Sequence, residues 1–138
     1  MEKVFVLVVE GQALIRISAV HMIEDSGFAA VGVANAVDAL ALLEKRSDIW
    51  AVFTDIIVCR TMAGLKLAKA IRERWPPIHL ILTAGLNAPD EGDFPLNGRF
   101  IGKPYAPSQV AAVLHELFAS KVALHKLPLS GGNYGKVS

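Results

Sequence analysis

The chain has little cysteine and almost no excess charge of either sign. Its one cysteine, Cys59, excludes an internal disulfide, which predicts a reducing, cytoplasmic location. Lys and Arg number 14 and Asp and Glu 13, so the net charge is +1 and no general attraction to nucleic acid or an anionic membrane is expected. We interpret Cys59 as a passive loop thiol, with an intermolecular disulfide as the alternative. Because the net charge is so small, we expect any partner to be recognised by a local surface and not by overall electrostatic attraction.

Apolar runs are short, and a phosphate-cradling loop is missing. Residues 4–9 form an apolar run of six residues, too short for a signal peptide or a membrane span, so we predict a buried strand and no membrane insertion. The next residues, 11–14 (GQAL), have neither the repeated glycines nor the hydroxyls with which flavin or nucleotide carriers hold phosphate. A flavin or nucleotide carrier is therefore disfavoured, and absence of visible absorbance would exclude the flavin version.

Short apolar or β-branched segments alternate with helical patterns along the 138 residues. This alternation predicts one α/β domain: a doubly wound, five-stranded parallel sheet with helices on both faces. We predict strands over residues 4–9, 29–33, 50–54, 79–83 and 99–101. We predict helices ending before Gly27, starting after Asn35, spanning residues 64–75, and starting after Pro107.

Two segments depart from this regular alternation. Residues 86–98 contain prolines, glycines and acidic residues in place of an apolar period, so the fourth helix is predicted to be short or irregular. Helical periodicity is lost beyond about residue 121, and glycines follow. We therefore expect a domain over residues 1–121 and a flexible tail over 122–138, with no output domain.

Four chemically active side chains stand at the ends of predicted strands or just after them. In open parallel sheets ligands bind outside the carboxyl ends of the strands, where Glu10, Asp55, Thr83 and Lys103 are expected to meet. Two carboxylates, a hydroxyl and an ammonium group suit phosphoryl transfer, which depends on positioning and charge neutralisation. Asp55 would be the nucleophile and form an acyl phosphate. Lys103 and Thr83 would bind phosphoryl oxygens, while Glu10 and Asp55 would help to hold Mg²⁺.

The segments that carry these residues are 6–10 (VLVVE), 53–56 (FTDI), 80–83 (LILT) and 100–104 (FIGKP). In their order and spacing they resemble the receiver domains of two-component response regulators, over about residues 4–120. The resemblance implies the flavodoxin-like receiver fold. It also implies a stand-alone phosphorelay protein, rather than an enzyme, that takes phosphoryl on Asp55 from a histidine kinase or a phosphotransfer protein.

The same resemblance implies further roles. Thr83 and Phe100 would act as a switch, the Lys103–Pro104 bond would be cis, and the backbone carbonyl of Ile57 would ligate the metal. The face formed by the fourth helix, fifth strand and fifth helix would meet protein partners, including a second copy of the chain as a homodimer. No direct contact with nucleic acid is expected.

The sequence departs from the receiver pattern at Gly11, where that family has a second acid. Glu10, Asp55 and Lys103 then sum to a charge of −1 in place of −2. One unit charge at about 4 Å corresponds to roughly 4 kcal/mol of raw attraction at an effective dielectric of about 20. We therefore expect weak Mg²⁺ binding and slow phosphorylation. The alternative is a pseudo-receiver, an interaction module that works without phosphorylation and binds partners equally well as wild type or Asp55→Asn.

Overall fold

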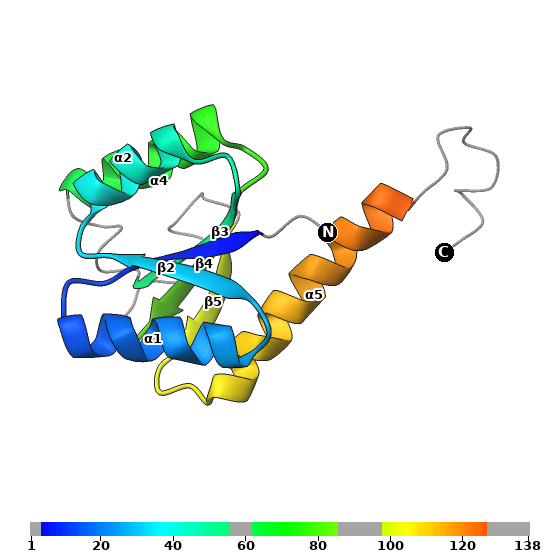
Figure 1. Cartoon of the computed structure of the whole chain (residues 1–138). Helices are drawn as coiled ribbons and strands as arrows, with labels where there is room; N and C mark the ends of the chain where they lie inside the picture. Colours follow the sequence, from blue (N-terminus) through cyan, green and yellow to red (C-terminus); the bar gives the residue numbers. More distant parts are fainter. Residues whose placement is uncertain (1–3, 56–61, 86–97, 127–138) are drawn as a thin grey trace.

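A computed structural model of the chain describes residues 4–55, 62–85 and 98–126 (Figure 1). In chain order its elements are β1 (Phe5–Val9), α1 (Ala13–Asp25), β2 (Ala29–Val33), α2 (Ala36–Lys45), β3 (Ile49–Asp55), α4 (Met62–Arg74), β4 (His79–Ala84), β5 (Arg99–Gly102) and α5 (Pro107–Lys126). No helix within the described ranges is both long and apolar enough to cross a membrane.

The five strands form one parallel sheet in the order β2-β1-β3-β4-β5. Helices α1 and α5 cover one face, and α2 and α4 cover the other (Figure 1). The predicted doubly wound, five-stranded parallel sheet is confirmed. In this topology the carboxyl ends of the three central strands β1, β3 and β4 lie side by side, which places the polar residues that follow them at one edge.

Alternate residues of the strands supply two hydrophobic cores. From β1, Val6 and Val8 enter the core beneath α1 and α5, whereas Leu7 and Val9 enter the core beneath α2 and α4. All four side chains are at most 1% exposed, which explains why the strand is a continuous apolar run rather than an alternating one.

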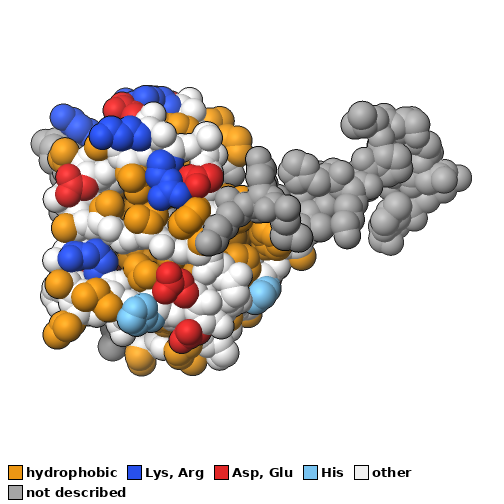
Figure 2. Space-filling view, in the orientation of Figure 1, with side chains coloured by type: hydrophobic (Ala, Val, Ile, Leu, Met, Phe, Trp, Pro, Cys, Tyr) orange, Lys and Arg blue, Asp and Glu red, His pale blue; other side chains and the backbone are white. Residues whose placement is uncertain are grey.

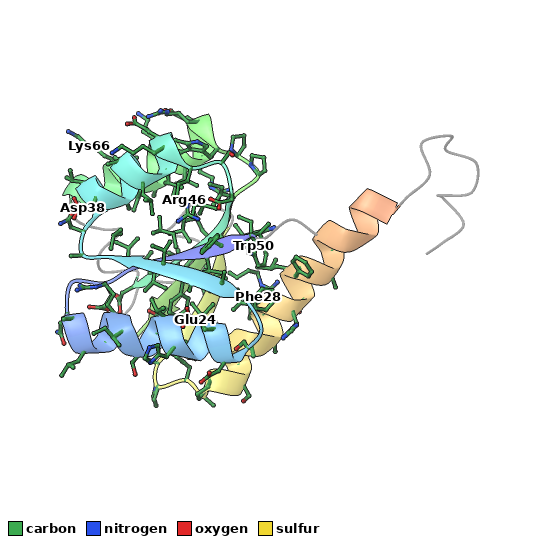
Figure 3. The ribbon with its side chains drawn as sticks, in the orientation of Figure 1. Glu24, Phe28, Asp38, Arg46, Trp50 and Lys66 are labelled. Carbon is green, nitrogen blue, oxygen red and sulfur yellow. The ribbon has the colours of Figure 1, made fainter. Side chains whose placement is uncertain are left out.

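An aromatic cluster fills the first core near the amino end of the sheet. The ring centroids of Phe28 and Trp50 lie 5.7 Å apart (Figure 3), and those of Trp50 and Phe118 lie 5.8 Å apart. These contacts join the residue before β2 to β3 and α5. The cluster therefore ties the last described helix to the sheet, at the opposite end from the candidate site.

Most predicted bounds agree with the structure to within one or two residues, but α5 is longer than expected. It continues to Lys126, five residues past the predicted domain boundary at residue 121. Residues 119–126 (ASKVALHK) contain no glycine or proline and several good helix formers, so the backbone stays helical after the apolar stripe ends. The predicted short fourth helix lies outside the described residues, as do residues 127–138 of the predicted tail.

Candidate functional site

The carboxyl edge of the sheet brings together the four predicted side chains. Asp55 is the last residue of β3 and pairs in register with Thr83 of β4. Glu10 follows β1 directly, and Lys103 follows β5 directly. The pairing of parallel strands therefore gathers residues that are up to 93 positions apart in the sequence.

Asp55 is more enclosed than Lys103, its cationic neighbour. Its side chain is 12% exposed, whereas that of Lys103 is 45% exposed. The ammonium group of Lys103 forms an ion pair with Oδ2 of Asp55, and the hydroxyl of Thr83 donates a hydrogen bond to the same oxygen over 3.4 Å. The carboxylate thus contacts a cation and a hydroxyl that are both able to bind an incoming anionic group.

Glu10 is fixed by its backbone and by its carboxylate. Its N–H donates to the Val33 carbonyl over 3.0 Å, and its own carbonyl accepts from the guanidinium of Arg16 over 2.8 Å. The Oε2 atom accepts from the N–H of Gln12 over 2.9 Å, so the carboxylate also closes the turn before α1. Glu10 therefore combines a structural role with its place at the site.

A small pocket opens between these residues. Polar groups of Glu10, Thr54, Asp55, Thr83 and Lys103 line it, and its walls are apolar side chains of β1, β3 and α1. Thr54 is buried and donates to the Val9 carbonyl over 3.0 Å, so its hydroxyl joins two strands.

Tyr105 also lines this pocket and was not predicted. Its ring meets Phe53 edge-on, with centroids 6.2 Å apart. Burial raises the pKa of its hydroxyl; the positive charge of Lys103 opposes that rise, and Glu10 and Asp55 add to it. The hydroxyl therefore stays protonated at neutral pH. Its position directly after Lys103-Pro104 was the only available signal, because an isolated loop tyrosine has no spacing that marks a site.

The other predicted features are the Lys103–Pro104 peptide bond, the switch residue Phe100 and the metal-ligand candidate Ile57. The Lys103–Pro104 peptide bond is cis, and the Lys103 N–H donates to the Ala84 carbonyl over 2.7 Å. Phe100 is half-buried on β5, in register with Leu82. Ile57 lies outside the described residues, as does Cys59.

The donor set fits a hard divalent cation only partly. Glu10 and Asp55 supply carboxylate oxygens, the ligand type that Mg²⁺ prefers. Among the described residues, no three His, Cys, Asp or Glu side chains gather closely enough to hold a metal ion. Gly11 is exposed at the point where a second acid would stand. Within the described ranges, the carboxylates of Glu10 and Asp55 are therefore too few to form a metal site by themselves.

Comparison with known proteins gives a consistent picture of the fold. No protein-family model matches the chain. Over an alignment of 119 positions the chain is 25% identical to the sensor kinase CckA of Brucella abortus (strain 2308), and the match covers 81% of this chain but only 12% of that kinase.

Several solved structures match the fold of this chain over most of their own length. A response regulator receiver domain protein from Clostridium thermocellum superposes with a TM-score of 0.75 at 17% identity, over 88% of this chain and 98% of that one. A response regulator receiver protein from Sinorhizobium medicae has a TM-score of 0.73 at 23% identity, and the match covers 84% of this chain and 94% of that one. The chemotaxis response regulator CheY4 of Vibrio cholerae has a TM-score of 0.71 at 20% identity, and the match covers 84% of this chain and 99% of that one.

Proposed function

We propose that this chain, which has the receiver-domain fold of response regulators, is a cytoplasmic regulator that accepts a phosphoryl group on Asp55. The donor would be a histidine kinase or a phosphotransfer protein, and the signal would pass through protein contacts. The observation that supports the proposal best is the pairing of one enclosed carboxylate, Asp55, with both Lys103 and Thr83 at the carboxyl edge of the sheet.

The chemistry follows from these contacts. A carboxylate oxygen of Asp55 attacks phosphorus of a phosphohistidine; the new P–O bond forms as the P–N bond breaks, and the leaving imidazole takes up a proton. Lys103 would exchange its contact with Asp55 for a phosphoryl oxygen, and Thr83 would donate to another. Mg²⁺, bound through Glu10, Asp55 and the carbonyl of Ile57, would supply further positive charge.

The first helix offers a contact surface for a protein donor. Leu14 is 83% exposed and Ile17 is 50% exposed on α1, and hydrophobic side chains are visible along that helix in Figure 2. A groove between α1 and the start of α5 shares Ile15, Ala19 and Tyr105 with the Asp55 pocket. A donor protein that reaches the enclosed Asp55 would therefore press against this apolar rim.

Substitution of the rim tests the contact. Leu14→Lys should slow phosphoryl transfer from a cognate kinase without changing the rate with acetyl phosphate, because the small donor needs no docking surface. An equal effect of Leu14→Lys on transfer from both donors would contradict the proposed contact.

The predicted homodimer face, which includes β5 and α5, remains part of the proposal. Sedimentation of the protein before and after phosphorylation would test whether it forms a dimer.

The central experiment is intact-mass spectrometry after incubation with acetyl phosphate and Mg²⁺. Wild type should gain one phosphoryl group, and Asp55→Asn should gain none. Asp48→Asn is a matched control, because Asp48 pairs with Arg46 at the opposite edge of the sheet and its loss should leave phosphorylation intact. Equal labelling of wild type and Asp55→Asn would place the phosphoryl group elsewhere and overturn the proposal.

A second candidate, the phosphorylation-independent interaction module, is favoured by Gly11 alone. It predicts that wild type stays unmodified even with candidate kinases, and that partners bind wild type and Asp55→Asn equally. A pull-down with both proteins as bait, compared quantitatively, separates the two candidates. A partner that prefers phosphorylated wild type would exclude this module.

A further inference from the structure

Arg16, on the first turn of α1, reaches back to the segment that carries Glu10. Its Nη1 donates to the Glu10 carbonyl over 2.8 Å, six residues earlier in the chain. Among the described residues Arg16 forms no ion pair, so its charged end is used for this backbone contact. A hydrogen bond from a charged donor is stronger than one between neutral groups.

The path of the Arg16 side chain depends on Gly32 in β2. A Cβ atom at Gly32 would lie 2.9 Å from Cγ of Arg16, 3.2 Å from Cδ, and 3.3 Å from Cγ2 of Val20. Glycine in the interior of a strand is unfavourable, and it often marks a place where another group approaches closely. Here the approaching group is the aliphatic stem of Arg16, which packs against Gly32 while its guanidinium contacts the Glu10 carbonyl.

The loop that receives this contact is largely exposed, and its other contacts at Glu10 are the N–H to the Val33 carbonyl and the carboxylate to the Gln12 N–H. Glu10 is half-buried, and the residues from Gly11 to Leu14 are exposed. Gly11 is also the position at which receiver domains carry a second acid, so a metal ion would have one side chain fewer through which to hold the loop. The hydrogen bond from Arg16 is therefore placed to determine where the Glu10 carboxylate lies.

We propose that Arg16, with Gly32 as the space that admits it, is a positioning residue that holds the β1–α1 loop and the Glu10 carboxylate at the phosphoryl-acceptor site. The link to phosphorylation depends on the function proposed above, but the link to loop order does not. Arg16 acts through Glu10 and does not line the Asp55 pocket.

The first test is amide hydrogen exchange at Gln12, whose N–H donates to the Glu10 carboxylate. It uses the full chain without metal or phosphodonor. Arg16→Met keeps an unbranched stem but removes the donor, and it should raise the Gln12 exchange rate by about tenfold, the scale of one charged hydrogen bond. Arg74→Met is the matched control, because Arg74 pairs with Glu44 on the α2/α4 face, and it should leave Gln12 unchanged. Unchanged exchange in Arg16→Met would overturn the proposal.

The second test examines whether Gly32 works through Arg16. Gly32→Ala should raise Gln12 exchange in wild type but should add much less in an Arg16→Ala background, where the clashing Cγ is gone. Equal effects of Gly32→Ala in both backgrounds would show that Gly32 acts independently of Arg16. That result would overturn the role of Gly32 as the space that admits Arg16.

The third test connects the loop to the site through the rate of phosphorylation by acetyl phosphate over a Mg²⁺ titration. Arg16→Met should raise the Mg²⁺ concentration for half-maximal rate severalfold and leave the rate at saturating Mg²⁺ nearly unchanged, because Arg16 positions a ligand and does not contact phosphoryl. A fall only in the saturating rate would contradict this role. If wild type takes no phosphoryl, the proposed function fails while the exchange result still decides the role of Arg16.

Discussion

Gly11 is the position at which a single side chain should change the chemistry most. It is exposed, its backbone is not in the left-handed region, and an added Cβ would meet only the Ala34 carbonyl, at an ordinary contact distance of 3.6 Å. Gly11→Asp should therefore fold normally. It restores one negative charge beside Glu10 and Asp55, and should tighten Mg²⁺ binding and speed phosphorylation by acetyl phosphate by about tenfold or more.

The measurement is a Mg²⁺ titration of the phosphorylation rate, read by intact mass. Gly11→Asn is the control, because it adds nearly the same volume without charge and should give a much smaller gain. A similar gain from both variants would mean that loop stiffness, rather than charge, limits the wild-type protein.

Two buried threonines at neighbouring positions of the sheet should respond differently to the same substitution. Thr83→Val removes the hydroxyl that donates to Asp55, and should slow phosphorylation by at least about tenfold, because that hydroxyl would bind a charged phosphoryl oxygen. Thr54→Val removes a donor to the Val9 carbonyl instead, and should cost about 1 kcal/mol of unfolding free energy with little effect on the rate. Urea melts and phosphorylation rates of the two variants check these expectations. A slow but stable Thr54→Val and a destabilised but fast Thr83→Val would contradict the roles given to the two hydroxyls.

The site was predictable where it depends on strand ends and not where it depends on side-chain paths. Asp55 and Thr83 lie at the carboxyl ends of recognisable strands and Lys103 directly follows one, so topology alone brings them to one edge. Arg16 and Tyr105 could not be placed in this way. The stem of Arg16 lies where a Cβ atom at Gly32 would clash with it, and Tyr105 lines the pocket from a loop; neither placement has a spacing pattern in the sequence.

The secondary-structure elements were predicted well because their signals are local. Buried parallel strands are continuous apolar runs, and glycine or asparagine marks several helix ends. The end of α5 was missed because the residues beyond 121 have intrinsic helix propensity but no apolar period in the sequence. Apolar periodicity alone therefore underestimates the length of such a helix.

The start of α2 depends on a local signal that can be removed. Asn35 is in an extended conformation, and its Oδ1 accepts from the Asp38 N–H over 2.8 Å. Asn35→Ala should lower the unfolding free energy by about 1 kcal/mol and the melting temperature by about 3–5 °C. Gln12 precedes α1 without a side-chain cap, so Gln12→Ala should cost much less. Equal losses in urea melts of the two variants would contradict a capping role for Asn35.

The sheet is shared by two cores, and each core has its own tryptophan. Trp50 is 7% exposed in the core beneath α1 and α5, whereas Trp75 packs against the core beneath α2 and α4. The strands that separate these cores contribute alternate residues to both. Loss of packing on one face would therefore also expose the strand residues that support the other face.

We expect the two faces to unfold together, as in most single domains of this size. Trp75→Phe leaves Trp50 as the only tryptophan, and Trp50→Phe leaves Trp75, because the chain has two. Within each variant, the urea midpoint from tryptophan fluorescence should coincide with that from far-ultraviolet circular dichroism, which reports all the helices. This internal comparison removes any difference in stability between the variants. A fluorescence transition that precedes the loss of helix in only one variant would show that its face opens separately, and that the shared strands do not couple the two cores.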